Sequence, residues 1–184
     1  MTELTTDRLL LRNWRDSDRE PFAALNTDPA VMEHFPAPQT REQSDALIDR
    51  NRPLIDERGW GLWALEVRDT GEFIGFTGLS VPSFEAHFMP AVEIGWRLAK
   101  GAWGNGYATE AARAALAHGF GPAGLDEVVS FTTTTNLPSQ RVMQRIGMTH
   151  DEPGDFDHPR IPEGHRLRRH VFYRIDRAQW ESTR

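Results

Sequence analysis

VEIGWRLAKGAWGNGYATEAARAALAHGF, residues 92–120, decides the fold of this chain because its residue pattern changes twice within one run. Every second residue from Val92 to Leu98 is apolar, and this period of two predicts a half-buried strand. Glycines then stand at positions 101, 104 and 106. From Tyr107 the run is rich in alanine, the best helix former, and it stops at Gly119 and Gly121. The stretch therefore predicts a strand, a glycine loop and a helix, in that order.

The glycine loop has the geometry of an anion site. The first turn of a helix has unpaired backbone N–H groups, and the helix dipole adds partial positive charge there. Glycine lets a phosphate approach the backbone without a Cβ in the way. The loop is thus either a cradle for a phosphate or pyrophosphate, or a turn that only connects strand to helix, and this stretch alone leaves both interpretations open.

Two general phosphate-binding motifs can be compared with the glycine loop. The P-loop pattern GxxxxGK[ST] does not occur. The dinucleotide fingerprint GxGxxG/A is matched by Gly104 and Gly106, but Thr109 stands where its third small residue belongs. Asp126 lies at a plausible distance for a ribose-binding acid, so a nucleotide-cofactor oxidoreductase stays as a weaker alternative.

Composition limits the class of protein. The length of 184 residues predicts one domain over residues 1–184. The absence of cysteine excludes disulfides, cysteine-ligated zinc and thiol catalysis. The net charge of −6 argues against general nucleic-acid binding and mildly favours a cationic substrate. Neither a signal peptide nor a membrane-spanning segment is expected, so we expect a cytoplasmic protein that does not bind membranes.

The rest of the chain predicts an α+β fold with a mixed, mostly antiparallel central sheet flanked by helices. Strands 60–68 and 73–81 flank an Asp/Gly turn and should form an antiparallel hairpin, where a dinucleotide-binding fold would need a helical crossover. Thr40 and Gln43 form a capping box for a helix that Pro53 should kink or divide and Gly59 should end. The other expected elements are strands 8–14, 126–133 and 169–175, helices 18–25 and 139–146, and loops 82–90 and 151–167.

Several stretches together resemble the GNAT superfamily of acetyltransferases, and in particular its RimJ/RimL-like branch. TTDRLLLR is similar to the first strand of that branch, and VEIGWRL followed by WGNGYATEA is similar to its cofactor motif. In the family loop pattern [QR]xxGx[GA], Gly104 and Gly106 match, and Gly101 stands where Gln or Arg is usual. The pattern NxxSxR at residues 136–141 and the tail GDFDHPRIPEGHRLRRHVFYRI complete the resemblance, which covers nearly the whole chain.

This resemblance implies the GNAT fold, acetyl-CoA as cofactor, and direct acetyl transfer to a primary amine in a ternary complex. A non-catalytic acyl-CoA-binding domain of the same fold is the alternative. Backbone groups of residues 103–109 would hold the pyrophosphate, residues 96–98 would pair with the pantetheine amides, and Asn136 would bond the pantetheine arm, with Ser139 near the sulfur. The full set of cofactor-binding residues implied is Trp96, Arg97, Leu98, Trp103, Gly104, Asn105, Gly106, Tyr107, Ala108, Thr109, Asn136, Ser139 and Arg141.

Two residues are the catalytic candidates. Glu93 would act as general base, since a glutamate on this strand is a recurrent base in the family; otherwise it is a solvent-facing strand residue. Glu110, in the first helical turn, suits a role in stabilising the helix dipole. Many family members protonate the leaving thiolate with a tyrosine, but Tyr107 and Tyr173 do not stand at that position. Ser139 is therefore the expected hydrogen-bond donor to the sulfur, or else only a helix cap.

The histidines do not predict a metal site. His150, His158, His165 and His170 match no metal-ligand spacing and have no cysteine partner. His158 and His165 lie either in a loop near the acceptor or simply on the surface. The expected partner is an amine acceptor, either a protein N-terminus or a small molecule, and the protein is expected to be a monomer or a homodimer that binds no nucleic acid.

Overall fold

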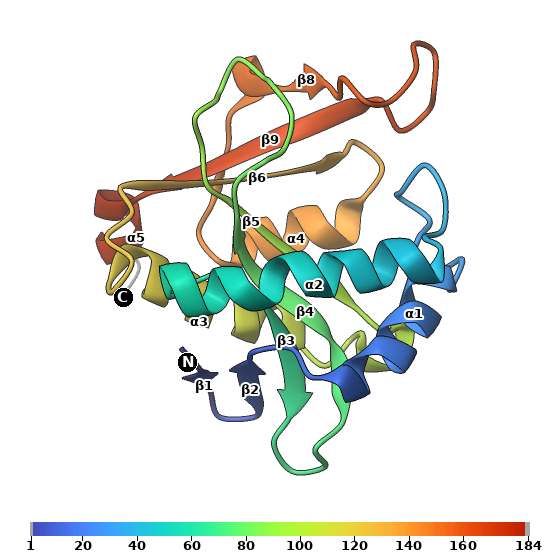
Figure 1. Ribbon diagram of the computed structural model, residues 1–184. Coiled ribbons are helices and arrows are strands. Elements are labelled where there is room, and N and C mark those ends of the chain that lie inside the picture. Colours follow the sequence, from blue (N-terminus) through green and yellow to red (C-terminus); the bar gives the residue numbers. More distant parts are fainter. Residues whose placement is uncertain (1, 183–184) are drawn as a thin grey trace.

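A computed structural model describes residues 2–182 of the chain. Nine strands form one sheet in the order β1-β2-β3-β4-β5-β6-β9-β7, with β8 paired to β9 (Figure 1). The strands are β1 Leu4–Thr5, β2 Leu9–Arg12, β3 Leu62–Val67, β4 Phe73–Ser80, β5 Glu93–Leu98, β6 Glu127–Thr133, β7 Thr149–His150, β8 Phe156–Asp157 and β9 Arg169–Asp176.

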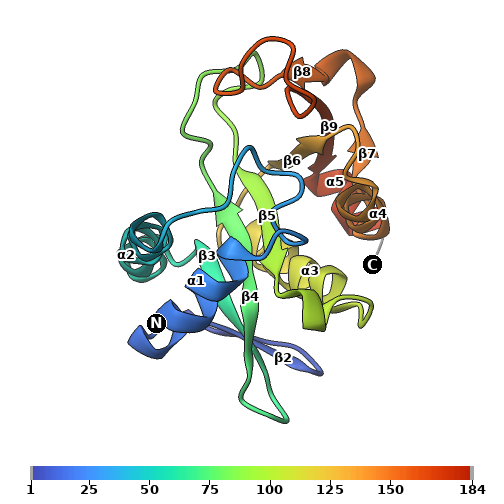
Figure 2. The same cartoon turned by 90° about the vertical axis from the view of Figure 1, so that its right-hand side faces the viewer.

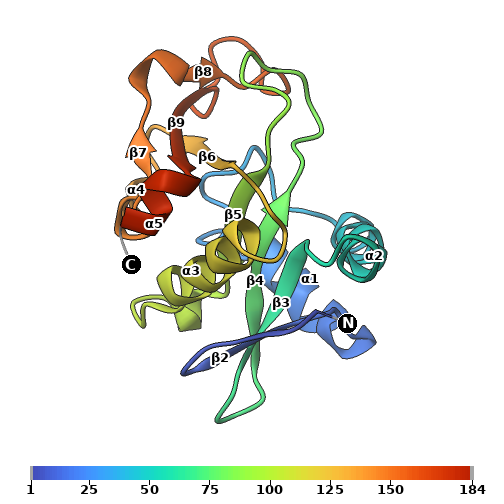
Figure 3. The same cartoon turned by 90° about the vertical axis from the view of Figure 1, so that its left-hand side faces the viewer.

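Helices lie on both faces of this sheet. Helices α1 and α2 cover one face of the β2–β5 half, and α3 covers the other (Figures 2 and 3). The helices are α1 Arg19–Thr27, α2 Arg41–Arg58, α3 Tyr107–Phe120, α4 Leu137–Arg145 and α5 Arg177–Ser182, with 3-10 turns at Asp16–Asp18, Lys100–Ala102 and Glu152–Gly154. The predicted fold class, a mixed and mostly antiparallel sheet flanked by helices, is therefore confirmed.

One pair of strands departs from the antiparallel pattern. β5 and β6 run parallel, and their register joins them through a single residue pair, Glu93 with Val129. Beyond that pair β6 continues along β9, whereas β5 continues along β4. The two strands consequently diverge (Figure 2), and the stretch between them without strand pairing is called the opening.

The predicted hairpin and the predicted helix start are both confirmed. β3 and β4 pair antiparallel around the turn that contains Gly71, so no helical crossover separates them. Thr40 and Gln43 form the expected reciprocal capping box at the start of α2. Gly59 ends the helix in the left-handed conformation with φ of 76°.

Of the kink or division expected at Pro53, the division does not occur. α2 runs without interruption from Arg41 to Arg58 with Pro53 inside it. Proline removes one backbone hydrogen bond from a helix interior, but Ile48 and Ile55 on either side of it are fully buried. Burial of this apolar face holds the helix together through the weakened turn.

The short elements β1, β7 and α5 were not anticipated from the sequence because two to six residues carry too little periodicity to detect. Trp14, Trp63 and Trp180 are buried, and Trp60 and Trp96 are partly buried. None of the helices between residues 2 and 182 combines the length and the apolar character that crossing a bilayer requires.

Candidate active site

The opening between β5 and β6 leaves part of a strand edge free. Backbone groups of alternate β5 residues point toward β6, as the bonds from Val129 N–H to the Val92 carbonyl and from Ser130 Oγ to the Ile94 carbonyl show (2.9 Å each). The same alternation places the N–H and C=O of Trp96 on this edge, where the register offers them no partner on β6. A ligand with amide groups could therefore pair with β5 at Trp96 as a further strand would.

Helix α4 faces this opening with its N-terminus. Asn136 caps the helix, since its Oδ1 accepts from the Ser139 N–H (3.3 Å) while its Nδ2 donates to Thr132 Oγ1 (2.9 Å). The Trp96 indole Nε1 donates to Ser139 Oγ at 3.3 Å. Because that oxygen accepts from Trp96, its own proton stays free to be donated into the opening.

The glycine loop is an open cradle. Gly104 and Gly106 have φ of 78° and 80°, the left-handed region that favours glycine. A Cβ built on Gly104 would meet nothing within 4 Å, and one on Gly106 would meet only Nη2 of Arg8 at 3.6 Å. Gly106 is also the N-cap of α3, so the first N–H groups of that helix face this space. The loop has the room, the donors and the dipole that a pyrophosphate needs.

Arg8 is a functional candidate that the sequence analysis missed. Its guanidinium donates to the Asn105 carbonyl (2.9 Å), pairs with Glu110 (2.6 Å) and lies 4.7 Å above the Tyr107 ring. It thus brings a cation to a loop whose motif lacks the usual Gln or Arg at Gly101. No sequence signal marks it, because it is 97 residues away from Asn105 in the chain.

Glu110 holds this arrangement in place. Partial burial alone would raise the pKa of its carboxyl, but hydrogen bonds from Thr6 and Arg8 together lower it. Glu110 is therefore ionised at neutral pH and engaged in structure, as its expected stabilising role requires. A groove of about 660 Å³ starts beside it and runs along α3, lined by Thr6, Asp7, Arg8, Gly106, Thr109, Glu110, Arg113, Ala114, Ala117, Arg145 and Trp180.

Glu93 lies on the other face of β5. It shares that face with Gly95 and Arg97, because alternate residues of a strand point the same way. A Cβ built on Gly95 would meet a single atom within 4 Å among the described residues, Oε1 of Glu93 at 3.9 Å. The Glu93 carboxyl therefore borders an empty space over Gly95.

The Glu93 carboxyl is electrostatically unusual. Its side chain is partly buried, and no hydrogen bond to it occurs within residues 2–182. Burial raises the pKa of this carboxyl to about 8, because nothing compensates the charged form for the water it loses. A carboxyl with a pKa near the working pH, at the edge of an open space, is suited to general base catalysis.

Three loops, the rim loops, are linked to one another by hydrogen bonds. They follow α1 (residues 28–40), β4 (residues 81–92) and β8 (residues 158–168). Arginines of the third loop tie it to the other two: Arg166 donates to the Glu33 carbonyl (3.0 Å) and Arg160 to the Ser83 carbonyl.

The two histidines expected in this region differ in environment. His158 packs against Phe84, with ring centroids 4.5 Å apart, and burial lowers its pKa to about 4, so the ring is neutral. His165 is exposed, and its Nδ1 accepts from the Leu167 N–H. His158 therefore lies among the rim loops, and His165 lies on the surface of one of them.

The structure brings most of the predicted cofactor residues together. Trp103 is exposed beside the cradle, and its indole donates to the Leu98 carbonyl at 2.9 Å; Asn105 donates to the Trp103 carbonyl. Ala108 packs against the core, and Thr109 lines the groove along α3.

One predicted residue, Arg97, has its side chain apart from that group. The Arg97 side chain lies on the face opposite Trp96, where it contacts Asn26 of α1. Arg141 is exposed on α4. The Arg97 carbonyl faces Gly75 of β4, so the backbone of Arg97 also lies away from the strand edge where the cofactor was expected.

Comparison with known proteins agrees with this geometry. Residues 8–149 match the family model described as "Acetyltransferase (GNAT) domain". The chain is 34% identical over 191 residues to the FsC-acetyl coenzyme A-N(2)-transacetylase of Aspergillus fumigatus, covering 96% of this chain and 77% of that protein.

Solved structures share the fold. A GNAT-family acetyltransferase from Bacillus anthracis superposes with a TM-score of 0.78 at 25% identity, covering 96% of this chain and 99% of that one. RimL, the ribosomal L7/L12 alpha-N-protein acetyltransferase, solved in complex with coenzyme A, superposes with a TM-score of 0.74. At 19% identity, over 95% of this chain and 97% of RimL, that second likeness concerns the fold alone.

Proposed function

Because this chain belongs to the GNAT family of N-acetyltransferases, we propose that it transfers the acetyl group of acetyl-CoA directly to a primary amine, either a protein N-terminus or a small molecule. The observation that carries the proposal is the opening between β5 and β6. It joins the unpaired backbone of Trp96 and the Ser139 hydroxyl on one side to the Glu93 carboxyl on the other.

The residues present fit acetyl-CoA. The cradle at Gly104 and Gly106, with Arg8 beside it, would hold the pyrophosphate, and the groove along α3 would hold the nucleotide end. The Trp96 backbone would pair with the pantetheine amides. When bound, acetyl-CoA supplies the thioester carbonyl carbon that the amine attacks.

Glu93 would take the proton from the acceptor nitrogen. An α-amine has a pKa of about 7.7–8.0 and a lysine side chain about 10.4, so an α-amine needs only modest help to become neutral. A carboxylate whose pKa is about 8 is matched to that proton. The space over Gly95 gives the nitrogen a position next to Glu93 Oε1.

Ser139 would stabilise the departing sulfur by donating its free hydroxyl proton in a hydrogen bond. Its position in the first turn of α4 adds the positive end of the helix dipole to that bond. A thiolate needs only such stabilisation, because the pKa of its thiol, about 8.5, is already low. No cysteine is present to carry an acyl group, which favours direct transfer over a covalent relay.

The branch of the family, the acetyl donor, the location and the oligomeric state are further assignments. The sequence motifs support placement in the RimJ/RimL-like branch. RimL has the same fold as this chain. The name of the Aspergillus relative supports acetyl coenzyme A as the donor. A cytoplasmic location and a monomeric or homodimeric state stay predictions.

Calorimetric titration with acetyl-CoA, with NADH as the control ligand, tests the cofactor. Saturable binding of acetyl-CoA alone, followed by CoA release on addition of primary amines, is the expected result. Binding of NADH alone would overturn the proposal. Acetyl-CoA binding without CoA release for any short peptide or small amine would leave only a non-catalytic acyl-CoA-binding domain.

A further inference from the structure

Arg97 has a charge that the protein itself does not balance. Its guanidinium is held between two rings, with Cζ 4.2 Å from the Phe35 centroid and 5.5 Å from the Phe76 centroid. Nη1 donates to Asn26 Oδ1 (2.6 Å) and to Gln39 Oε1 (3.3 Å), both neutral amides. Nε is buried and has no hydrogen-bond partner in the described part of the chain. Burial lowers the pKa of Arg97 to about 10.

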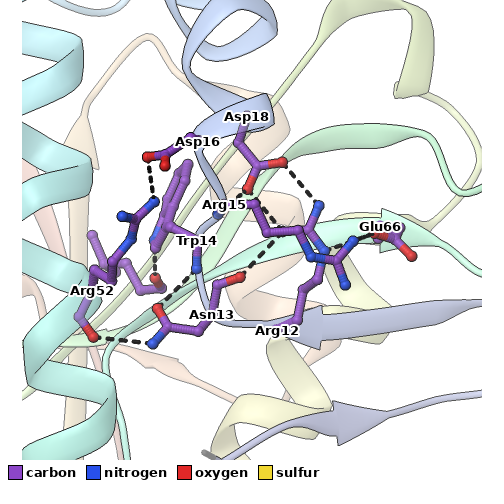
Figure 4. A network of polar contacts seen from close by, with 9 residues as sticks. Arg12, Asn13, Trp14, Arg15, Asp16, Asp18, Arg52 and Glu66 are labelled. Atoms are coloured by element: carbon purple, nitrogen blue, oxygen red, sulfur yellow. Dashed lines mark hydrogen bonds and ion pairs between the residues drawn. The ribbon is translucent and has the colours of Figure 1, made fainter.

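Another buried arginine shows how this chain neutralises such a charge. Arg12 is 2% exposed and bonds Asp18 through Nη1 and Nη2 and Glu66 through Nε, at 2.7 to 2.9 Å (Figure 4). Burial alone would lower the pKa of Arg12, but these two carboxylates raise it. No carboxylate within residues 2–182 forms an ion pair with Arg97. A buried guanidinium without a counter-ion is unfavourable, and this points to an anion supplied from outside.

The position of Arg97 indicates which ligand would bring that anion. Arg97 shares the Glu93 face of β5, with Gly95 and its empty space between them. Residues two apart on a strand are separated by about 7 Å. An acceptor whose nitrogen lies over Gly95 beside Glu93 would therefore place a neighbouring group near the guanidinium. The cofactor cradle begins α3, which covers the opposite face of the sheet from the α1 residue that Arg97 contacts (Figures 2 and 3).

The charge around the site does not by itself favour an anion. The three rim loops carry three arginines and four carboxylates, and the whole chain has a net charge of −6; these side chains are Arg160, Arg166, Arg168, Asp28, Glu33, Glu85 and Glu163. Repulsion from distant carboxylates is screened within about 10 Å, whereas a contact with a desolvated guanidinium is not. The contact with Arg97 itself is therefore what would select an anion.

We propose that the acceptor is a primary amine that also carries a carboxylate, and that this carboxylate pairs with Nη2 of Arg97, to which no described residue is bonded. The inference rests on the proposed acetyl transfer. Two sources share this chemistry: free amino acids and other short amino-carboxylates, and peptides with an acidic residue near the N-terminus. Nη1 of Arg97 meanwhile holds the loop after α1 in place through Asn26 and Gln39.

The test uses matched acceptors that differ only in charge. One set pairs amino acids and short ω-amino acids with their carboxamides, and another pairs peptides that begin with Asp with peptides that begin with Asn. The kcat/KM of CoA release is measured for wild type, Arg97→Gln, Arg97→Lys and, as a surface control, Arg50→Gln. The first set reports free amino-carboxylates and the second reports acidic N-termini.

We expect wild type and Arg50→Gln to favour the acid of at least one pair. Arg97→Gln should lower the acid-to-amide ratio roughly 10- to 100-fold, the worth of a charged hydrogen bond, and Arg97→Lys should keep part of the preference. A comparison of ratios cancels the intrinsic reactivity of each amine. The expected acetyl-CoA site lies on the opposite face of the sheet from the Arg97 side chain. Calorimetry should therefore give each variant the wild-type affinity for acetyl-CoA.

Four outcomes would overturn the inference. Wild type could use acid and amide alike, or Arg97→Gln could lower both rates equally, which would make Arg97 only a clamp for the loop after α1. CoA release with neutral amines alone would also contradict it and leave the proposed function standing. If none of the amines caused CoA release, the proposed function would fail as well. If Arg97→Gln does not fold, the wild-type ratios and Arg97→Lys still decide.

Discussion

Trp96 of β5 and Ser139 of α4 meet at the opening between β5 and β6, where the indole Nε1 donates to the hydroxyl Oγ at 3.3 Å. The contact joins a strand edge with unpaired backbone to the positive end of a helix. It also orients the hydroxyl, because an oxygen that accepts from Trp96 directs its proton elsewhere. The two residues therefore act together on whatever lies in the opening.

Ser139→Ala should lower kcat by roughly 10-fold or more, because it removes one donor to the developing negative charge. Trp96→Phe should lower kcat less, since the hydroxyl remains but loses its orientation. Steady-state kinetics with acetyl-CoA and a competent amine measures both effects, with Ser17→Ala as an exposed control. An unchanged kcat in Ser139→Ala would leave Ser139 with capping alone.

Gly106→Val should abolish acetyl-CoA binding, because a branched side chain would fill the cradle and oppose φ of 80°. Gly124→Val is the matched control, since Gly124 also has positive φ, 67°, and open space around it, but lies after α3. Both variants should lose stability, and only Gly106→Val should lose the calorimetric signal. Equal affinity in the two variants would contradict the cradle assignment.

Glu93→Gln should lower kcat by roughly 100-fold, the usual worth of a general base. In wild type the rate per neutral amine should rise with pH and level off above about 8, as the Glu93 carboxyl ionises. The variant should lose this rise, whereas exposed Glu72→Gln should keep it. A rise that persists in Glu93→Gln would assign the titration to another group.

Glu93 should also make stability depend on pH. Folding raises the pKa of its carboxyl from 4.5 to about 8, so between these values the folded protein binds more protons than the unfolded chain. The free energy of unfolding therefore falls as pH rises through this window. Allowing for partial contact with solvent, the loss should be on the order of 2 kcal/mol.

Urea denaturation of wild type and Glu93→Gln at pH 5.5 and at pH 9 checks this dependence. The variant cannot ionise at this position, so its stability relative to wild type should increase at the higher pH. A difference between the two proteins that stays constant with pH would mean that Glu93 has an ordinary pKa in the folded state.

Asp18→Ala should destabilise the fold by about 3–5 kcal/mol, because it leaves the buried Arg12 with only Glu66 (Figure 4). Chemical denaturation measures the change. Glu20→Ala, which breaks an exposed pair with Arg41, should leave the midpoint nearly unchanged. Similar losses in the two variants would mean that burial does not strengthen the Arg12 pair.

The sequence by itself determined the elements and the position of the glycine loop. Periodicity placed β5, the β3–β4 hairpin and α3, and glycine spacing placed the cradle, because these features depend on residues close together in the chain. Pro53 shows the limit of local rules, since α2 runs through it undivided, with Ile48 and Ile55 buried on either side, although backbone chemistry alone allowed a division.

Only the tertiary structure decided which distant side chains share a site. It brought Arg8 to the glycine loop and Ser139 to Trp96, and it turned the Arg97 side chain away from the cofactor edge toward Asn26. It also buried the Glu93 carboxyl without a partner, which sets its pKa. These features depend on desolvation and on contacts between segments far apart in sequence, and neither is encoded in the spacing of neighbouring residues.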